Sequence, residues 1–416
     1  MKIIYKVLLF ICFCFIVLVF AHFVYAETVD SKFEDTNFYN CVKEAVGTSG
    51  YDTNGVISES ALQSLTSLDC SQKNISNIKG LELMINLTSL KLYNNKIANI
   101  DVSMLPELKI LYVYDNQLTS IDVKKNTKLQ DLAVGNNKLT SLDVSANTEL
   151  YNLGISNVEN IDNKNEITSL DVTNNTKLVR FDAYNNQLTN LDVSKLTELE
   201  KLYVNDNKLT SLILGNNTKL VRLDAYNNQL TNLDVSKNTN LVELYVYKNN
   251  LTNIDVSKLT ELENFYVYDN KLTSIDVSKN TKLKKLSIGN NQLTNLDVSK
   301  NTALVYLNVR NSENTINNNK LTSIDLTNNS SLKEVYLSGN YFDENICNTL
   351  NVEKCVNSYS ANDNSNPSGN DNSKKTDKNV LINPQTGFSG YYVFIVLAFL
   401  LLSSLLVYLN RAINKR

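Results

Sequence analysis

Leucine and valine recur in a fixed order along most of the chain. The repeating unit reads L-x-x-L-x-V-x-x-N-x-L-T-x-L-D-V-S-x-N-T-x, and its first leucine occurs thirteen times between Leu65 and Leu332. Nine of the twelve spacings are 21 residues, one is 22 and two are 28. The two long units carry a similar seven-residue insertion, around residues 157–164 and 311–318. A fixed period in this range predicts a solenoid of stacked repeats over residues 65–342.

The first part of each unit predicts a short strand. In L-x-x-L-x-V, the second leucine and the valine alternate with polar residues, as in a strand with one buried face. Stacked about 4.8 Å apart, such strands would form a parallel sheet, and the L-T-x-L leucines would fill the core from the opposite wall. Too few residues remain for a long helix, so we expect an outer wall of turns, 3-10 pieces or short extended segments around Asp-Val-Ser. The fold class is therefore α/β with a dominant β component.

Asparagine recurs at one position just after the strand, within x-x-N-x-L. A short amide there can satisfy backbone groups where the chain turns under the strand. Turn propensity alone would also favour asparagine, but the constant phase favours a stacked ladder. The predicted ladder consists of Asn95, Asn116, Asn137, Asn186, Asn207, Asn228, Asn249, Asn270, Asn291 and Asn340.

This repeat resembles that of the leucine-rich repeat proteins, specifically bacterial surface proteins of the internalin kind. The likeness covers about 280 residues of the chain. It implies a curved, right-handed solenoid with the parallel sheet on its concave face, where such proteins usually bind their ligands. Two departures matter: the unit has 21 residues instead of the usual 22, and no immunoglobulin-like domain fits before the linker. The receptor of an internalin therefore cannot be carried over.

The ends of a solenoid must be covered. We expect an N-terminal cap over residues 27–64, with an amphipathic helix at 38–46 and a turn at Asp52-Thr53-Asn54-Gly55. That turn resembles a calcium loop but does not have its later ligands. Residues 343–356 would form the C-terminal cap. An exported chain permits the disulfides Cys41–Cys70 and Cys347–Cys355, with free buried thiols as the alternative.

The two ends of the chain carry targeting signals. Residues 1–26 have the charge, apolar run and small-residue end of a secretory signal peptide, with an uncleaved anchor as the alternative. Residues 357–382 read as a disordered linker. The apolar run 391–409 is long enough for a transmembrane helix, and the basic tail 410–416 places its end in the cytoplasm. Before this run lie Asn383, Pro384, Gln385, Thr386 and Gly387. That order resembles a cell-wall sorting signal, which implies cleavage after Thr386 by a sortase and attachment to peptidoglycan; a plain membrane anchor is the alternative.

Composition excludes several classes of function. The only histidine is His22, which lies in the expected signal peptide, so the mature chain can hold no Ser-His or Cys-His dyad and no histidine-bound metal. The formal net charge of -3 gives no reason to expect a nucleic-acid partner. We expect no cofactor and no enzymatic activity. Aspartates recur at the L-D-V-S position, for example Asp192, Asp234, Asp255 and Asp276, and we interpret them as structural caps of turns instead of a calcium site.

The strand positions that flank the inward leucine and valine are rich in tyrosine. Tyrosine and arginine dominate the energetics of protein interfaces, and aromatic pairs also bind the apolar faces of sugars. Tyrosine is also favoured on strand surfaces, and copying of repeats would multiply it without a ligand. The sequence therefore predicts either an adhesin that reads a protein or glycan on its concave face, or a passive surface component. The predicted ligand-binding residues, all expected to be exposed, are Tyr112, Tyr184, Tyr203, Tyr226, Tyr245, Tyr247, Tyr266, Tyr268, Arg180, Arg222, Asp182 and Asp224, with Tyr93, Tyr114, Tyr306, Tyr336, Lys201 and Glu243 around them.

Overall fold

The computed structural model describes residues 29–158, 162–312 and 317–358. These residues fall within one compact unit, Met1–Asp371. The expected signal peptide, the sorting motif, the apolar run 391–409, the basic tail and all but two residues of the expected linker lie outside the described residues. Within the described part of the chain, no helix is long and apolar enough to cross a membrane.

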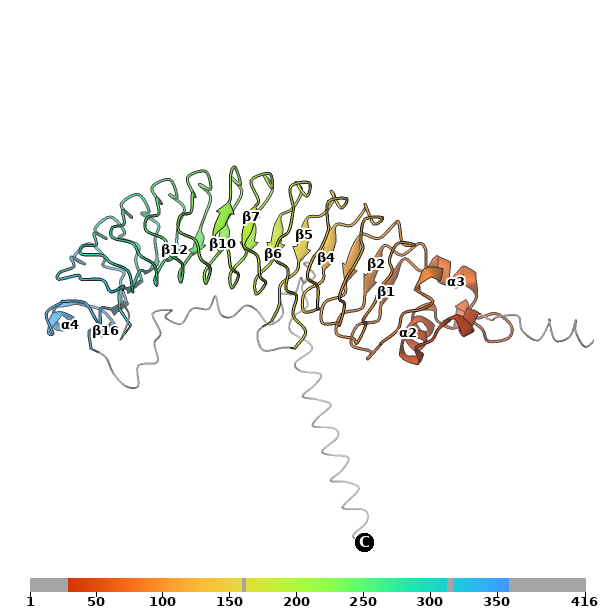
Figure 1. Cartoon of the computed structure of the whole chain (residues 1–416). Coiled ribbons are helices and arrows are strands. Elements are labelled where there is room, and N and C mark those ends of the chain that lie inside the picture. The colour runs from red at the N-terminus through yellow and green to blue at the C-terminus, as the bar shows by residue number, and fades with distance from the viewer. Residues whose placement is uncertain (1–28, 159–161, 313–316, 359–416) are drawn as a thin grey trace, which may run out of the picture. The chain divides into compact units, whose positions relative to one another are not determined.

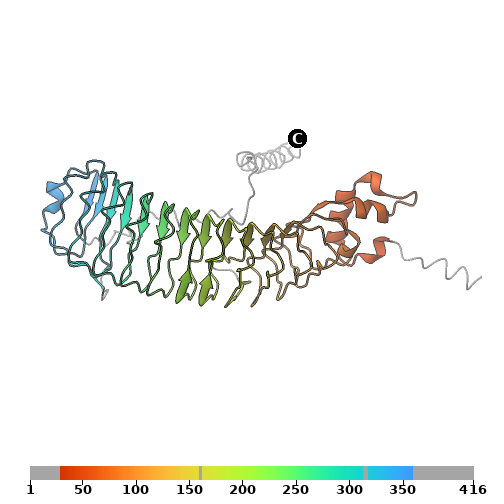
Figure 2. The same cartoon turned by 90° about the horizontal axis from the view of Figure 1, so that it is seen from above.

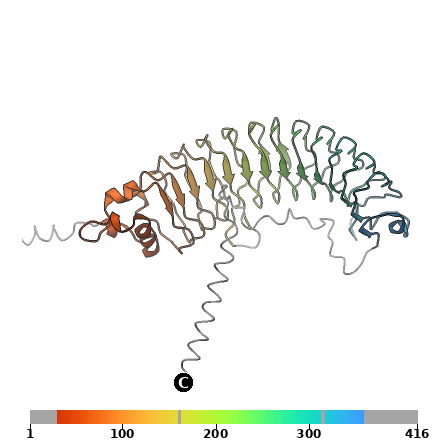
Figure 3. The same ribbon diagram turned by 180° about the vertical axis from the view of Figure 1, so that it is seen from behind.

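The repeats form a parallel sheet that contains one short strand from each unit (Figure 1). Fourteen strands of the described residues pair in chain order, apart from β7 and β9, which lie elsewhere. Figure 3 shows the same strands side by side from behind. The strands are β1 (Ser67–Asp69), β2 (Ser89–Lys91), β3 (Ile110–Tyr112), β4 (Asp131–Ala133), β5 (Asn152–Gly154), β6 (Arg180–Asp182), β8 (Lys201–Tyr203), β10 (Arg222–Asp224), β11 (Glu243–Tyr245), β12 (Asn264–Tyr266), β13 (Lys285–Ser287), β14 (Tyr306–Asn308), β15 (Glu334–Tyr336) and β16 (Lys354–Val356).

The sheet keeps one register throughout, because the second leucine of each unit pairs with that of the next. Leu223 lies opposite Leu202 on one side and Leu244 on the other. All three side chains are fully buried in the continuous apolar core, which confirms the predicted inward position of this leucine. The predicted parallel sheet and leucine core are therefore present, and they result from a single strand pattern repeated in phase.

The outer wall consists mainly of turns, as the short repeat requires. Two units instead contain extended segments, β7 (Asn190–Asp192) and β9 (Ser211–Ile213), which pair with each other in a second sheet. Figure 2 shows the large sheet along the inner edge of the curved solenoid and this pair along the opposite edge. One repeat has a 3-10 turn, η3 (Leu81–Leu83).

Aspartates of the L-D-V-S position cap the outer turns. The Asp255 carboxylate accepts a hydrogen bond of 2.9 Å from the backbone N–H of Ser257, and Asp276 accepts one of 2.8 Å from Ser278. The hydrogen bonds that Asp276 accepts from Ser278, first of all the one from the backbone N–H, lower the pKa of Asp276 below its ordinary value. The row of aspartates is thus a set of turn caps, which is the interpretation that the sequence favoured.

The predicted asparagine ladder joins each repeat to its neighbours. Asn249 shows the pattern: its Nδ2 donates to the carbonyls of Ala225 and Val246, each at 3.0 Å, and its Oδ1 accepts the N–H of Leu230 at 3.0 Å. The residue before each ladder asparagine often adopts a left-handed conformation, for example Asn227 with φ 52°. Asparagine and aspartate tolerate that conformation better than most residues, which explains the Asn-Asn and Asp-Asn pairs of the repeat.

A second asparagine ladder, which the sequence analysis did not single out, lies in the turns of the outer half. Asn280 is typical, because its Nδ2 donates to the carbonyls of Val256 at 2.9 Å and Leu259 at 2.7 Å in the preceding repeat. The asparagine of D-V-S-x-N-T thus has a structural role in adjacent turns. The members of this ladder are Asn126, Asn147, Asn175, Asn217, Asn238, Asn280, Asn301 and Asn329.

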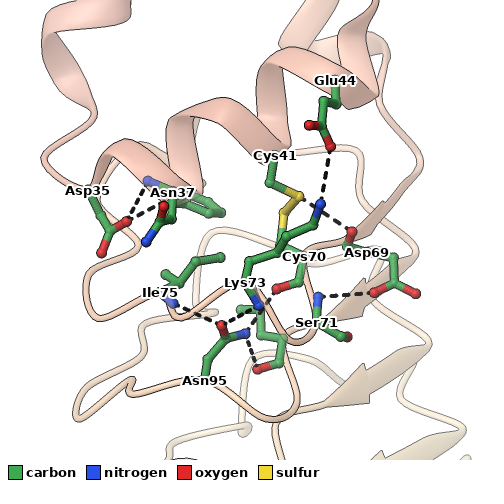
Figure 4. Close-up of a disulfide and its surroundings, with 12 residues drawn as sticks. Asp35, Asn37, Cys41, Glu44, Asp69, Cys70, Ser71, Lys73, Ile75 and Asn95 are labelled. Carbon is green, nitrogen blue, oxygen red and sulfur yellow. Dashed lines mark hydrogen bonds and ion pairs between the residues drawn. A yellow bond between two sulfur atoms is a disulfide. The ribbon is translucent and has the colours of Figure 1, made fainter. Parts of the chain in front are cut away.

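Short helices cover the first repeat: η1 (Val29–Lys32), α2 (Thr36–Val46), η2 (Thr48–Gly50) and α3 (Glu59–Ser64). The expected helix at 38–46 lies within α2. Asp35 caps α2 by accepting the N–H of Phe38 at 3.0 Å, and its second oxygen accepts the N–H of Ser76 at 2.8 Å. A disulfide between Cys41 on α2 and Cys70 after β1 ties the cap to the sheet (Figure 4). These are the two cysteines paired on sequence grounds.

Two elements close the other end of the sheet. The short helix α4 (Ile346–Thr349) follows the last repeat, and β16 adds the final strand beside β15. Cys347 and Cys355 form a disulfide across this segment. At the other end, the segment expected as a turn is one, because Asp52 accepts the N–H groups of Asn54 at 2.8 Å and Val56 at 2.9 Å.

Candidate functional site

The candidate site lies on the face of the sheet that points away from the leucine core. Each strand contributes three positions to this face: before the second leucine, directly after it, and after the following valine. The register places these positions in three rows, which we call the first, middle and third rows. The first row brings Arg180, Lys201 and Arg222 side by side, and the middle row brings Tyr203 between Asp182 and Asp224.

Two arginines enclose one tyrosine at the centre of this face. The Arg180 guanidinium carbon lies 4.8 Å from the centre of the Tyr203 ring, and that of Arg222 lies 5.3 Å from it. Such contacts attract a cation to the face of an aromatic ring. Tyr203 and both arginines remain partly exposed, so this cluster can reach a ligand.

Each arginine is held by an aspartate of its own strand. Arg180 contacts Asp182 at 2.9 Å, and Arg222 contacts Asp224 at 2.9 Å. Arg222 also contacts Glu243 on the next strand at 2.7 Å. The paired aspartates lie beneath the guanidinium groups and are almost fully buried. The prediction that Asp182 and Asp224 are exposed is therefore wrong: they orient the arginines and do not present a free carboxylate.

Burial and pairing shift the ionisation of these groups. Burial raises the pKa of Asp182 to about 6, although the charge and hydrogen bond of Arg180 oppose that shift. For Arg222, burial alone would lower the pKa, but Asp224, Tyr203 and Glu243 together raise it above the ordinary value. Both arginines are thus fixed cations whose charge is largely offset from below.

The tyrosines C-terminal to this cluster pack against one another. Tyr247 stacks on Tyr226 with ring centres 4.4 Å apart and on Tyr268 at 4.3 Å. Tyr245 and Tyr266 lie opposite each other in the register, with ring centres 5.2 Å apart. Parallel strands are about 4.8 Å apart, so equivalent rings on successive strands meet at stacking distance.

Most tyrosines of this face are less exposed than the sequence predicted. The five rings of the stacked group form an apolar cluster of their own, separate from the leucine core. Reading one strand at a time ignores the neighbouring rings, which cover the faces of each ring. Tyr184 and Tyr203 are partly exposed as expected. The prediction of exposure is wrong for Tyr112, Tyr226, Tyr245, Tyr247, Tyr266, Tyr268 and Tyr336.

A further acidic residue of this face was missed. Asp131 in the first row is fully buried and accepts a hydrogen bond of 2.8 Å from the Tyr112 hydroxyl. The sequence could have shown it, because Asp131 stands at a first-row strand position. The preceding repeat has Ile110 at that position, and a later repeat has Arg180. The described residues contain no group of three or more His, Cys, Asp or Glu side chains that could hold a metal ion.

Solved structures of known proteins share this fold. The functional domain of InlJ from Listeria monocytogenes, described as including a cysteine ladder, is 33% identical over 80% of this chain and 76% of its own, with a TM-score of 0.67. The chain belongs to the internalin-like leucine-rich repeat proteins. The internalin InlF of the same species is 24% identical over 74% of this chain and 96% of its own, with a TM-score of 0.55.

More distant structures extend the likeness of fold beyond Listeria. The leucine-rich repeat protein LIC12759 from Leptospira interrogans is 23% identical over 71% of this chain and 84% of its own, with a TM-score of 0.57. No family model and no curated protein sequence matches the chain. In this internalin-like chain the four described cysteines form terminal disulfides, and asparagines supply the ladders between repeats.

Proposed function

We propose that this internalin-like protein is an exported, wall-anchored surface protein that binds a protein or glycan on the sheet face of its repeats. The observation that carries the proposal is the cluster of Tyr203 between Arg180 and Arg222. Tyrosine and arginine provide most of the energy at protein interfaces. Here the sheet and the buried aspartates already hold these side chains, so little side-chain entropy would be lost on binding.

The test of binding uses exposed side chains of this cluster. Tyr245 and Tyr266 are among the residues predicted from the sequence to bind a ligand, but their rings are buried in the stacked cluster, and their loss would disturb the sheet. We therefore choose the double variant Lys201→Ala/Tyr203→Ala. It should weaken binding to the cell or matrix component that the parent recognises by about 2 kcal/mol or more, while the loss of the two cation–π contacts lowers the free energy of unfolding by only about 1–2 kcal/mol and leaves the protein folded.

The matched control changes the same two residue types away from the sheet face. Lys258 is exposed on the outer wall, and Tyr341 is exposed after the last ladder asparagine. The variant Lys258→Ala/Tyr341→Ala should bind as the parent does. If this control abolishes adhesion while the Lys201/Tyr203 variant retains it, the binding face is wrong. If the parent binds nothing in a screen of surface proteins and glycans, the passive surface role is correct.

Anchoring rests on the order of the C-terminal signals and is tested separately. Thr386 would be the residue that a sortase joins to the wall. The variant Thr386→Ala should shift the protein from the cell-wall fraction to the membrane fraction. Covalent attachment to peptidoglycan that is unchanged in this variant would refute the sorting signal without affecting the binding proposal.

A further inference from the structure

An arginine with an aspartate two positions later occurs twice at the centre of the sheet face, but the neighbour on the next strand differs between the two copies. Arg222 of β10 lies opposite Glu243 of β11 in the register. Arg180 of β6 lies opposite Lys201 of β8. One copy therefore has an acid beside its arginine, whereas the other has a second base. We call Arg180 and Lys201 the basic pair.

In the copy at β10, carboxylates bind all three nitrogens of the guanidinium group. Asp224 accepts hydrogen bonds from Nε and Nη2 of Arg222, each at 2.9 Å. Glu243 accepts a hydrogen bond from Nη1 at 2.7 Å. The Glu243 carboxylate thus shows where an acid lies when it completes this arrangement.

In the copy at β6, one nitrogen of the guanidinium group stays available. Asp182 accepts a hydrogen bond from Nε of Arg180 at 2.9 Å and contacts Nη2 at 2.9 Å. Among the described residues, Nη1 of Arg180 makes no hydrogen bond, and Nζ of Lys201 makes neither a hydrogen bond nor an ion pair. Lys201 acts on Asp182 only at a distance: burial raises the pKa of that carboxyl, and the charges of Arg180 and Lys201 oppose the rise. Lys201 is exposed and Arg180 is partly exposed, so both can reach a ligand.

Other acidic residues nearby do not take the place that Glu243 has in the other copy. Asp131 lies two strands before Arg180, where it is buried and accepts a hydrogen bond of 2.8 Å from the Tyr112 hydroxyl. Glu200 directly precedes Lys201 in the chain, and no ion pair joins it to either base in the described structure. The basic pair therefore has two cations against one buried carboxylate, so it carries an excess of positive charge.

The surroundings of the basic pair favour a peptide over a sugar. The guanidinium carbons of Arg180 and Arg222 lie over the Tyr203 ring, at 4.8 Å and 5.3 Å from its centre, and they come from the strands on either side. The ring therefore has no free face on which a sugar could stack. At the starts of the strands, Val221 is 38% exposed and Val179 is half-buried beside the first row. Apolar side chains next to a basic pair suit an extended protein segment that carries an acid.

We propose that the basic pair binds an aspartate or glutamate side chain from an acidic segment of a protein partner. The carboxylate accepts hydrogen bonds from Arg180 Nη1 and Lys201 Nζ, as Glu243 accepts one from Arg222. Hydrogen bonds between two charged groups are about twice as strong as those between neutral groups. This inference rests on the proposed function and narrows its ligand to an acidic protein segment at this position.

The test uses the full chain in an uncharged detergent, at an ionic strength of about 0.1 M, where exposed charges more than about 10 Å apart are screened. The probe is a peptide of three Glu-Gly units with blocked ends, and saturation-transfer NMR reports its binding. It should bind with a dissociation constant on the order of 1 mM and more weakly as salt is added. The matching Gln-Gly peptide should not bind. The formal net charge of the chain is -3, so a general attraction to an acidic peptide is not expected.

A change at Lys201 separates binding from folding. Lys201→Glu places an acid opposite Arg180, so it should fill the site from within and weaken the peptide at least tenfold. The melting temperature should stay equal or rise, because Arg180 gains a partner. The matched control is Lys285→Glu, the same change of charge at an exposed first-row position of β13, four strands from β8. It should bind the peptide as the parent does.

A change at Glu243 should act in the opposite direction. Glu243→Gln removes the acid beside Arg222 and makes the first row more positive, so the peptide should bind about threefold more tightly. The matched control is Glu334→Gln, since Glu334 occupies the same row and also accepts a hydrogen bond from a tyrosine two positions later, Tyr336. This control should leave the affinity for the peptide unchanged.

Three outcomes would overturn the inference. They are no binding of the acidic peptide by the parent, parent-like binding by Lys201→Glu, and tighter binding of a trimer of N-acetylneuraminic acid, whose three carboxylates on sugar rings would indicate an acidic glycan. If the Lys201→Ala/Tyr203→Ala variant loses its natural partner while the parent does not bind the peptide, the sheet-face function stands and only the acidic segment is refuted. If that variant keeps its natural partner, the proposed function itself is refuted.

Discussion

The ladder asparagine Asn249 offers a direct measure of how the repeats are held together. Replacing it by alanine leaves the N–H of Leu230 without its acceptor and removes one donor each from the carbonyls of Ala225 and Val246. These carbonyls retain a second bond from the ladder, because Asn228 and Asn270 also donate to them. The N–H of Leu230 is therefore the group that becomes unpaired.

The expected cost follows from these three bonds, which are the shortest of the four that Asn249 makes. A buried donor left without a partner costs about 1–3 kcal/mol, and each lost bond to a carbonyl that keeps another donor costs about 0.5–1.5 kcal/mol. The sum is about 2–6 kcal/mol, which is a large part of the stability of a typical domain. A repeat protein can unfold in stages, so the damage should be greatest in the repeats next to Asn249.

Urea unfolding followed by far-UV circular dichroism measures the loss, and hydrogen exchange shows where it occurs. The matched control is Asn253→Ala in the same repeat, because Asn253 is exposed and its replacement should change stability by no more than about 0.5 kcal/mol. Equal stability of the two variants would refute the reasoning, since the phase-locked asparagine would then be no more than a turn former.

Two other perturbations test the core and the N-terminal cap. Leu223→Ala should cost about 2–5 kcal/mol and Leu223→Asp more, as the same unfolding experiment can measure; parent-like melting of both would mean that the strand register is wrong. Burial raises the pKa of Asp35, but hydrogen bonds from Ser76, Phe38 and Asn77 outweigh this effect and lower it. Its stabilisation should be complete above the unfolded pKa of about 3.9 and be lost as the pH falls through the lower folded value. Asp35→Asn should remove this acid-dependent part of the unfolding curve, and an unchanged curve would contradict the role of Asp35.

Most of the fold could be read from one repeat, because each unit of a solenoid contacts mainly its neighbours. The alternation of apolar and polar residues around Leu223 predicted that its side chain is buried. The constant position of Asn249 within the repeat predicted the asparagine ladder. The insertions were harder to interpret. Asn165 and Asn319 take the ladder position after the extra residues, with Asn165 Oδ1 accepting the N–H of Leu139 at 3.0 Å and Asn319 Oδ1 accepting that of Leu293 at 3.0 Å. An insertion shifts the phase, so a search at fixed spacing passes over them.

The site was harder to predict than the fold, because exposure on a sheet depends on several strands at once. Because Tyr247 directly follows the valine of the strand pattern, the sequence correctly predicted that its ring points away from the leucine core. Its burial follows from Tyr226 and Tyr268, which are 21 residues away on either side in the sequence. The pairing of Arg180 with Asp182 was available locally, because residues two apart on a strand share one face, but the near-complete burial of Asp182 depends on the neighbouring strands. Long-range ties of the cap, such as that between Asp35 and Ser76, are also invisible to a local pattern.

Repetition itself limits what the tyrosine rows can say about function. Arg180–Tyr184 and Arg222–Tyr226 are near copies, so duplication alone would spread tyrosines and arginines along the face, and ring stacking would then preserve them by stability. The small residues of β4 follow from copying as well, because Ala133 and Gly135 correspond to Ser287 and Gly289 in a second block that is also followed by a long unit. The cluster around Tyr203 depends on more than one copied residue, since Arg180 and Arg222 reach the same ring from two different strands. Copying and stacking explain a row of like side chains, whereas they do not require this mixed cluster to stay partly exposed, so the Lys201→Ala/Tyr203→Ala variant is the measurement that separates binding from repetition.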